Sequence, residues 1–248
     1  MATILQFTDL HLRDDPAASV RGVVPQRSFD EALYHARRHD WPADAVLLTG
    51  DLANDEYEKT YVRLAGIAAG WQTPVLAIPG NHDNKHALRA AFDAVPGMAG
   101  NVLDLERWRI VALDSQVPRK VHGDLAEDMW RLLDDAAATR DDRHLLICLH
   151  HHPLSIGSRW LENIGLQNAE DFRKKISALG VRACLFGHAH QEWDSVENGV
   201  RYLGTPSTGR QFEPGSDNFS ETDDPPAYRW LELQDDGEIE TKVVWVNR

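Results

Sequence analysis

The sequence of 248 residues lacks features that would mark several classes of protein. It has no excess of basic residues, because 26 Lys and Arg stand against 39 Asp and Glu, which gives a formal net charge of −13. A protein that coats nucleic acid needs a basic face, so we expect no nucleic-acid partner. It also has no run of about 18 apolar residues, and we therefore predict no membrane span and no membrane partner.

Cysteine is nearly absent, and the first residues carry no pattern of a secretory signal. Cys148 and Cys184 lie in the apolar runs LLICLH and RACLFG, which predicts buried, small hydrophobic side chains in strands. Two cysteines exclude a disulfide framework. The chain enters the apolar segment ILQF directly, without a basic region or a long apolar stretch. Together these features predict a cytoplasmic protein, and they leave its oligomeric state open.

What the sequence does contain, in its first half, is a regular alternation of short apolar runs and amphipathic segments. The apolar runs are predicted as strands at 3–8, 45–49 and 74–78. The segments between them, with apolar residues at helical spacing, are predicted as helices at 27–39, 56–69 and 86–94. Strands that alternate with helices are typical of crossover units in a layered α/β fold.

The second half repeats this pattern with more β-structure. Strands are predicted at 101–105, 108–113, 145–149, 182–186, 192–197, 200–204, 228–233 and 238–246, and helices at 124–138 and 169–179. Asn198-Gly199 predicts a type I′ hairpin turn. Residues 204–226 are rich in Gly, Ser, Pro and Asp without periodicity and are predicted as a long loop. Because no linker or repeat interrupts the chain, we expect one domain, 1–248.

Polar clusters directly follow five of the predicted strands. They are the sequences TDLH at 8–11, GD at 50–51, GNHD at 80–83, HHHP at 150–153 and GHAH at 187–190. In open α/β sheets the carboxyl ends of the strands form the ligand crevice, so we expect the five clusters to converge. Asp, Asn and His without thiolates form a mixed nitrogen and oxygen donor set, which favours Mn, Fe, Zn, Co or Ni over a structural zinc site.

The donors are too numerous for a single ion. The seven candidates are Asp9, His11, Asp51, Asn81, His150, His188 and His190. If one carboxylate bridges two ions, each ion has four protein ligands, as in two-metal hydrolytic sites. The motifs differ in specificity, from GD, which alone is almost uninformative, to GHAH, which is stronger, and the prediction depends on their joint occurrence at strand ends. Spacing does not choose between His150 and His152, which point to the same side of an extended chain.

The ordered pattern D-x-H, G-D, G-N-H-D, H-H and G-H-x-H resembles the calcineurin-like metallophosphoesterases. Further segments resemble one branch of them, the bacterial class III 3′,5′-cyclic AMP phosphodiesterases of the CpdA type. These segments are HHHPL at 150–154, Trp160-Leu161, TPST at 205–208 with Gln211-Phe212, and LDSQ at 113–116. The resemblance implies an α/β fold in which two sheets form a sandwich flanked by helices, a four-layer αββα arrangement, with the site at one edge.

The resemblance also implies a role for each residue. The first metal ion would be held by Asp9, His11 and His190, and the second by Asn81, His150 and His188. Asp51 would bridge the ions and serve catalysis with His82, the general acid or charge stabiliser at the phosphate, which Asp83 would orient. The residues that contact the substrate would be His11, Asn81, His82 and His190.

The implied activity is hydrolysis of 3′,5′-cyclic AMP to 5′-AMP by a metal-bridging hydroxide. The alternatives are a broader phosphoesterase, or a non-catalytic scaffold of the same fold, which the complete set of ligand types disfavours. Two ions of Fe, Mn, Zn or Co would supply the positive charge that an acidic chain lacks. Loops 152–163 and 204–219 would surround the base, with Trp160, Phe212 or Arg210 in contact with it, although ordinary loop packing is the favoured explanation for each of these residues.

Overall fold

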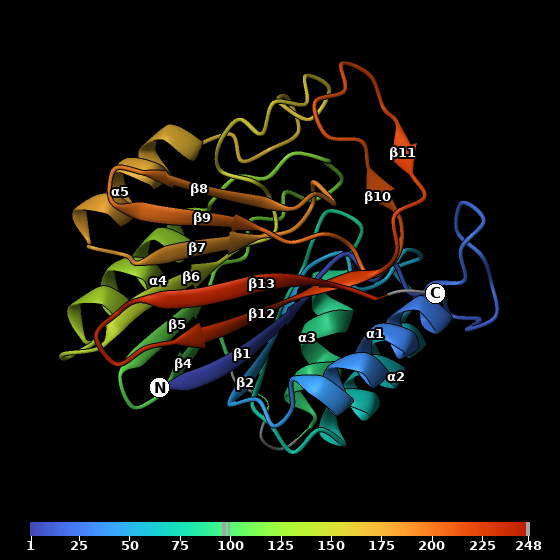
Figure 1. Cartoon of the computed structure of the whole chain (residues 1–248), viewed down its shortest axis with the longest axis horizontal. Coiled ribbons are helices and arrows are strands. Elements are labelled where there is room, and N and C mark those ends of the chain that lie inside the picture. The colour runs from blue at the N-terminus through green and yellow to red at the C-terminus, as the bar shows by residue number, and fades with distance from the viewer. Residues whose placement is uncertain (96–97, 99, 247–248) are drawn as a thin grey trace.

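The computed structural model, which describes residues 1–95, 98 and 100–246, contains two large β-sheets packed face to face (Figure 1). The first sheet has the strand order β13-β12-β1-β2-β3. Its strands are β1 (Ala2–Phe7), β2 (Ala45–Thr49), β3 (Val75–Ile78), β12 (Ala227–Leu233) and β13 (Ile239–Trp245). β1, β2 and β3 are parallel, and β12 runs antiparallel to β1.

The second sheet has the order β4-β5-β6-β7-β9-β8. Its strands are β4 (Val102–Asp104), β5 (Trp108–Ala112), β6 (His144–Cys148), β7 (Ala183–Phe186), β8 (Trp193–Glu197) and β9 (Val200–Gly204). β5, β6, β7 and β9 are mutually parallel neighbours, and β4 and β8 form the antiparallel edges. The predicted positions of Cys148 and Cys184 are confirmed, because both are free, buried and in strands.

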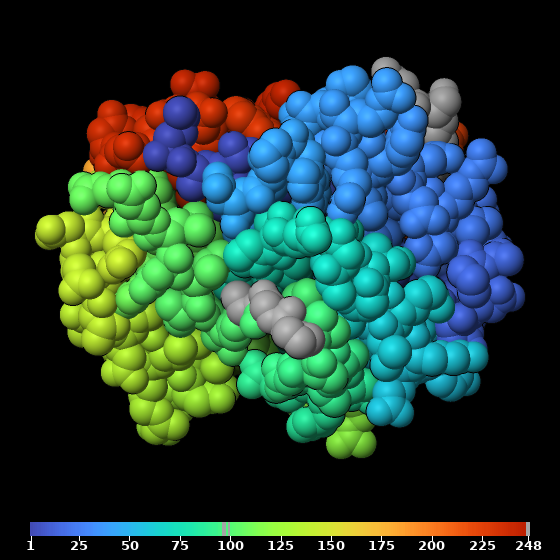
Figure 2. All heavy atoms as spheres, turned by 90° about the horizontal axis from the view of Figure 1, so that it is seen from below, coloured from blue at the N-terminus to red at the C-terminus, as the bar shows by residue number. Residues whose placement is uncertain are grey.

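Among the residues that the structure describes, five helices cover the outer faces of the sheets. They are α1 (Pro25–His39), α2 (Glu58–Ala69), α3 (Lys85–Asp93), α4 (Glu127–Ala138) and α5 (Ala169–Ala178). The helix ends follow local signals: Pro25 opens α1, and the Asn84 side chain accepts hydrogen bonds from two amides of the first turn of α3. Figure 2 shows a face that is occupied mostly by the first half of the chain, coloured blue to green.

Three apolar clusters separate these four layers. One contains Phe29 and Leu64 of the first helices together with Phe7 of β1. The second packs α4 and α5 on the outer face of the second sheet. The third lies between the sheets, where Ile4 and Leu146 are fully buried. Burial of each large aliphatic side chain contributes about 1.5–3 kcal/mol, so these clusters fix the sandwich. The predicted αββα fold is confirmed.

The predicted strands and helices are all present, with ends shifted by at most three residues. Asn198 and Gly199 have φ of 50° and 80°, which confirms the type I′ turn. The prediction of an unstructured loop at 204–226 is wrong in part, because β10 (Gln211–Phe212) and β11 (Glu221–Thr222) form an antiparallel pair there. Strands of two residues are too short to produce a periodic signal. No helix in the described part of the chain has the length and apolarity needed to cross a membrane.

Candidate metal centre

The five polar clusters meet at one edge of the sandwich, and they come from both sheets. Three of them follow β1, β2 and β3 of the first sheet, and two follow β6 and β7 of the second. Hydrogen bonds across the sheets join them: the ring of His150 contacts the Thr49 carbonyl oxygen over 2.9 Å, and the His188 amide donates to Asp9 Oδ2 over 3.0 Å. The convergence expected from the sequence therefore depends on the packing of the two sheets as well as on strand direction.

Four candidate ligands form a first group. Asp9 Oδ1 lies 3.1 Å from His190 Nε2, and His11 Nε2 lies 3.4 Å from the same nitrogen. His11 Nε2 is also 3.8 Å from Asp51 Oδ2. All four side chains are buried or nearly so. Donors at 2.0–2.2 Å from a shared ion lie about 3.0–3.5 Å from one another, so this spacing suits one metal ion.

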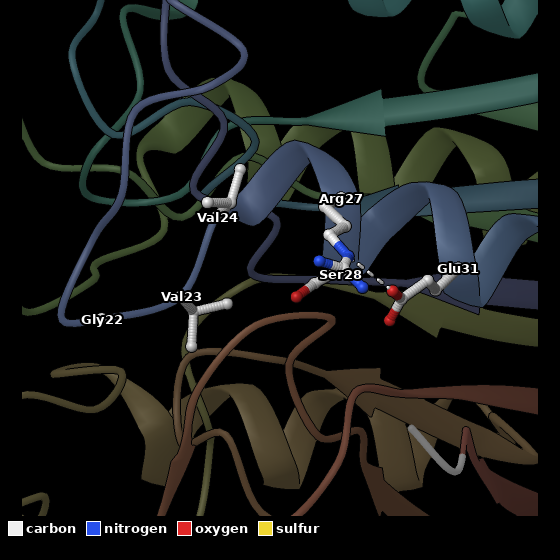
Figure 3. Close-up of a pocket in the computed structure, with 6 residues that line it drawn as sticks. All are labelled: Gly22, Val23, Val24, Arg27, Ser28 and Glu31. Carbon is white, nitrogen blue, oxygen red and sulfur yellow. Dashed lines mark hydrogen bonds and ion pairs between the residues drawn. The ribbon is translucent and has the colours of Figure 1, made fainter.

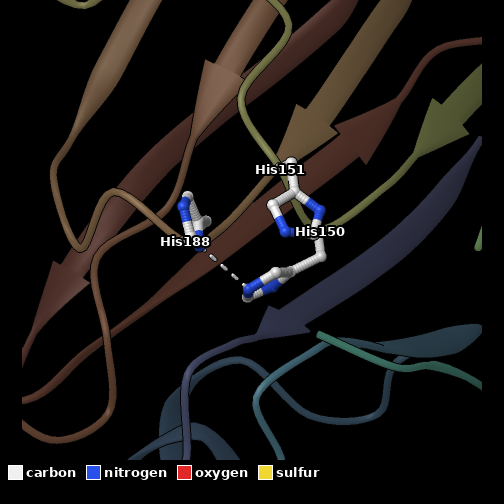
Figure 4. Close-up of side chains that lie close together, drawn as sticks. All are labelled: His150, His151 and His188. Carbon is white, nitrogen blue, oxygen red and sulfur yellow. Dashed lines mark hydrogen bonds between the residues drawn. The ribbon is translucent and has the colours of Figure 1, made fainter. Parts of the chain in front are cut away.

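A second group forms around His150. Its Nε2 lies 3.3 Å from Asn81 Oδ1, 3.3 Å from His188 Nδ1 and 3.5 Å from Asp51 Oδ2. Figure 4 shows the rings of His150 and His188 directed toward each other. The same oxygen of Asp51 therefore faces both groups, which is the geometry of a carboxylate that bridges two ions.

The chemistry of these atoms fits cations. His190 Nδ1 faces the Arg210 carbonyl oxygen over 2.6 Å, and because that oxygen can only accept, Nδ1 carries the proton and Nε2 presents a lone pair. When the ring of His150 is neutral, Thr49 fixes it in the same sense. Asp9 Oδ1 is buried without any hydrogen-bond partner. Hydrogen-bond acceptors such as His190 Nε2 and Asp9 Oδ1 therefore face one another without a donor between them, an arrangement that a metal ion stabilises.

The charge states of Asp51, His11 and His188 favour metal binding. The pKa of the Asp51 carboxyl lies well below its usual range. Burial alone would raise this pKa, but the neighbouring imidazoles lower it by more. Burial lowers the pKa of His11 to about 4 and that of His188 well below its usual value. In the metal-free protein burial also lowers the pKa of His150, but Asp51 and Asp9 raise it to about 9. An ion bound at His150 therefore displaces a proton.

Backbone conformation marks the same residues. Five of the seven candidates have left-handed φ values: Asp9 (53°), His11 (48°), Asp51 (50°), His188 (64°) and His190 (50°). Positive φ is uncommon outside glycine, costs on the order of 1–3 kcal/mol per residue and clusters at functional sites. Each of these turns directly follows a strand and directs a side chain toward the shared edge.

The motif glycines are required by close packing. A Cβ on Gly80 would lie 2.2 Å from Asp51 Oδ1, and a Cβ on Gly187 would lie 2.1 Å from Thr8 Oγ1. Both distances are far shorter than any real Cβ contact. The glycines of GNHD and GHAH therefore leave space for the neighbouring carboxylates.

His82 lies beside the first group, with its side chain exposed. Its backbone amide donates to Asp51 Oδ1 over 2.8 Å, and its ring centroid is 5.0 Å from that of His11. The residue is thus fixed to the shared carboxylate through its backbone, and its imidazole remains accessible to a bound molecule.

The prediction that Asp83 orients His82 is wrong. The buried Asp83 carboxylate instead accepts hydrogen bonds from the amides of Gly80 (2.8 Å), Leu52 (3.1 Å) and Ala53 (2.9 Å) and from Tyr61 Oη (3.1 Å). Burial and the nearby Asp51 raise its pKa to about 7. Asp83 therefore holds together the loops that carry Asp51 and Asn81.

The three consecutive histidines differ in the atoms that their rings contact. The chain bends at His150 and His151, so the alternation of an extended chain does not apply there. All three rings lie near His188, at centroid distances of 5.1, 4.7 and 5.6 Å. His151 has a protein partner at each nitrogen, Ser115 Oγ at 2.8 Å and the Val121 carbonyl oxygen at 3.1 Å. The ring of His150 instead contacts Asn81 Oδ1 and Asp51 Oδ2.

A pocket of about 270 Å³ opens beside the first group. Its lining includes His11, His82 and His190 together with residues from two distant segments, 20–23 and the β10–β11 hairpin. Phe212 lines it and stacks on His190 at 4.1 Å with an interplanar angle of 9°. Trp160 does not line this pocket and contacts Phe212 edge-on at 5.2 Å.

Sequence reasoning missed the turn at 20–23 and Glu221 as pocket residues. Val20 and Val23 form a bridge around Arg21 and Gly22, whose φ values are 49° and 81°. An Arg-Gly pair is not among the common signals for such a turn. A neighbouring pocket of about 320 Å³ at the start of α1, shown in Figure 3, shares Val23 but contains none of the candidate ligands.

Comparison with known families and proteins agrees with this geometry. The model of the calcineurin-like phosphoesterase family matches residues 2–192. The chain is 39% identical over 242 residues to the 3′,5′-cyclic adenosine monophosphate phosphodiesterase CpdA of Escherichia coli, covering 97% of this chain and 88% of that protein. It is 34% identical to the protein of the same name from Pseudomonas aeruginosa, with the same two coverages.

Solved structures share the fold at low sequence identity. A dimetal phosphatase from Danio rerio superposes with a TM-score of 0.62 at 14% identity and covers 99% of each chain. A purple acid phosphatase from yellow lupin, Lupinus luteus, gives a TM-score of 0.64 at 12% identity over 93% of this chain and 49% of that one. At these identities the similarity concerns the fold alone.

Proposed function

Because this chain belongs to the calcineurin-like phosphoesterase family, we propose that it hydrolyses 3′,5′-cyclic AMP to 5′-AMP with two bound metal ions. The substrate assignment is supported by the named relatives, which align with 97% of the chain. The observation that carries the proposal is the position of Asp51 Oδ2, which is 3.8 Å from His11 Nε2 and 3.5 Å from His150 Nε2. One oxygen between two sets of donors is what a two-metal phosphoesterase requires.

The proposed ligand sets follow these two groups. The residues for the first ion are Asp9, His11 and His190, those for the second are Asn81, His150 and His188, and Asp51 is shared. Fe, Mn, Zn and Co are all compatible with these donors. When bound, two such ions would lower the pKa of a coordinated water molecule to about neutral and would offset the negative charge of the phosphate.

The protein's own contribution is to hold the ligands in place before substrate arrives. Asp9 Oδ2 accepts hydrogen bonds from Thr8 Oγ1 at 2.8 Å and from the His188 amide at 3.0 Å, which leaves Oδ1 directed at the first group. Carbonyl oxygens fix the rings of His150 and His190. Such outer contacts set the tautomer and orientation of each ligand.

His82 is the proposed general acid. Its imidazole is exposed beside the pocket, next to His11, and its backbone is fixed to Asp51. In the reaction the bond between phosphorus and the ribose 3′-oxygen breaks, and His82 would donate a proton to that oxygen. His11, Asn81 and His190 would contact the phosphate together with His82.

The proposed location is the cytoplasm. The two cysteines support it, since both are free and buried, and free thiols persist in reducing compartments. Fractionation of the native source, with detection of this chain in the soluble fraction, would test the location independently of the activity.

A metal-reconstituted activity panel tests the proposed function. The protein is stripped with a chelator, reloaded with Mn, Fe, Zn or Co, and assayed on cyclic AMP, cyclic GMP, bis(p-nitrophenyl) phosphate and p-nitrophenyl phosphate. We expect chelator-sensitive activity with the highest kcat/KM on cyclic AMP. A much higher value on bis(p-nitrophenyl) phosphate would indicate a broad phosphodiesterase. Full metal loading without activity on any ester would indicate a scaffold.

A further inference from the structure

Glu221 brings a carboxylate with an unused acceptor to the pocket beside the candidate centre. Its Oε1 is buried and has no hydrogen-bond partner. The cation paired with it is Arg21, whose Nη1 lies 3.6 Å away, beyond normal hydrogen-bond distance. A buried carboxylate oxygen without a donor is unfavourable, and a bound molecule with an N–H group would satisfy it.

The strand register places this carboxylate close to the reacting groups. Phe212 of β10 pairs directly with Glu221 of β11, and both line the pocket. Directly paired residues of antiparallel strands project to the same side of the sheet. Because the ring of Phe212 lies flat on His190, Glu221 is one strand away from a candidate metal ligand.

The other charged groups of this wall are already engaged with the protein. Arg210 Nε and Nη2 each donate to the Arg21 carbonyl oxygen over 3.2 Å, and Nη1 donates to Asp223 Oδ1 over 2.8 Å. The side chain of Arg21 lies over the ring of Phe219, 4.6 Å from its centroid. The remaining lining near the turn is apolar, with Val20 and Val23.

We propose that this pocket binds the nucleobase and that Glu221 accepts a hydrogen bond from its exocyclic amine. The inference rests on the proposed function, because it names how the same site recognises its substrate. An ionised carboxylate only accepts hydrogen bonds, so it matches an amino group such as N6 of adenine. Val20 and Val23 supply the apolar surface against which the flat base packs.

A double-deletion cycle tests this contact by removing the Glu221 carboxylate and the exocyclic amine of the base, separately and together. The ligands are cyclic AMP and the 3′,5′-cyclic phosphate of unsubstituted purine riboside, which lacks the amine. In the unaltered enzyme we expect cyclic AMP to have the lower KM by about tenfold, as a hydrogen bond to a charged group predicts. In Glu221→Ala the two KM values should become equal. Glu221→Gln, which keeps the side-chain shape, should show a reduced preference.

The control variant is Glu213→Ala. Glu213 is an exposed glutamate in the same hairpin, directly after β10, and it does not line the pocket. It should keep the tenfold preference. If Glu221→Ala raises KM equally for both ligands, or retains the preference, Glu221 does not bind the amine and the inference is wrong. Glu213→Ala should also leave the hydrolysis of bis(p-nitrophenyl) phosphate, which has no base, unchanged. An unaltered enzyme that cleaves this diester but not cyclic AMP would refute the proposed substrate instead.

Discussion

The substitution Gly187→Ala tests the packing around the candidate centre with a single methyl group. The added Cβ would lie 2.1 Å from Thr8 Oγ1 and 2.6 Å from Asp9 Oδ2. Neither atom is free to move, because Thr8 Oγ1 donates to Asp9 Oδ2 over 2.8 Å and both residues are fully buried. The methyl group must therefore displace the carboxylate that is proposed to hold the first ion.

The expected cost has two parts. Inserting a methyl group into a packed interior typically costs about 1–3 kcal/mol. Losing the hydrogen bond from Thr8 to the Asp9 carboxylate adds about 1.5–3 kcal/mol, as for bonds to charged groups. We therefore expect the free energy of unfolding to fall by roughly 2.5–6 kcal/mol and the melting temperature to fall on the order of 10 °C. The first metal ion should also bind more weakly.

Thermal unfolding, elemental analysis of bound metal and cyclic AMP hydrolysis measure these effects. Gly66→Ala is the matched control, since a Cβ there meets nothing within 4 Å and Gly66 lies inside α2. It should stabilise the protein by up to about 1 kcal/mol. The double variant Thr8→Ala with Gly187→Ala should be more stable than the two separate losses predict. Strict additivity, or normal melting and two bound ions in Gly187→Ala, would refute the reasoning.

Three further substitutions probe individual roles. In His82→Ala, both ions should remain bound while turnover falls about 10²–10⁴-fold, and near-normal kcat on cyclic AMP would rule out a general acid. Asp51→Ala should lose metal and activity together, because both donor groups share its Oδ2, and elemental analysis that finds two equivalents of metal would contradict the bridge. Asp83→Ala leaves three buried backbone amides without a hydrogen-bond acceptor and should lower the free energy of unfolding by about 3 kcal/mol or more. An unchanged urea midpoint would show that Asp83 does not stabilise these loops.

The sequence carried much of the fold because its signals are local. Short apolar runs marked most of the strands, and Asn198-Gly199 marked a turn whose φ values are both positive. Parallel strands bring their carboxyl ends to one edge, so polar motifs after each strand could be assigned to a common place. The division of those strands into two sheets is not local, and it was expected only from the family resemblance.

The contacts that sequence reasoning missed join residues far apart in the chain. Glu221 meets Arg21 across 200 positions, and no periodic pattern relates a turn near the start of the chain to a hairpin near its end. Asp83 adjoins His82, which suggested a contact between them. The structure shows that its carboxylate is used by a loop about 30 residues earlier. Adjacency in sequence is a poor guide where backbone amides compete for a buried carboxylate.

The ligand types also explain how the chain reaches this geometry. Five candidate ligands are Asp or His in the left-handed region, and these two residue types are among the few that enter it more readily than other side chains. The residues that bind metal well are thus also those that tolerate the sharp turns after the strands. What remains unfavourable is the crowding of acceptors, with Asp9 Oδ1 buried and unpaired in a chain of net charge −13. Two cations would relieve that crowding and give an acidic protein a positive centre for an anionic substrate.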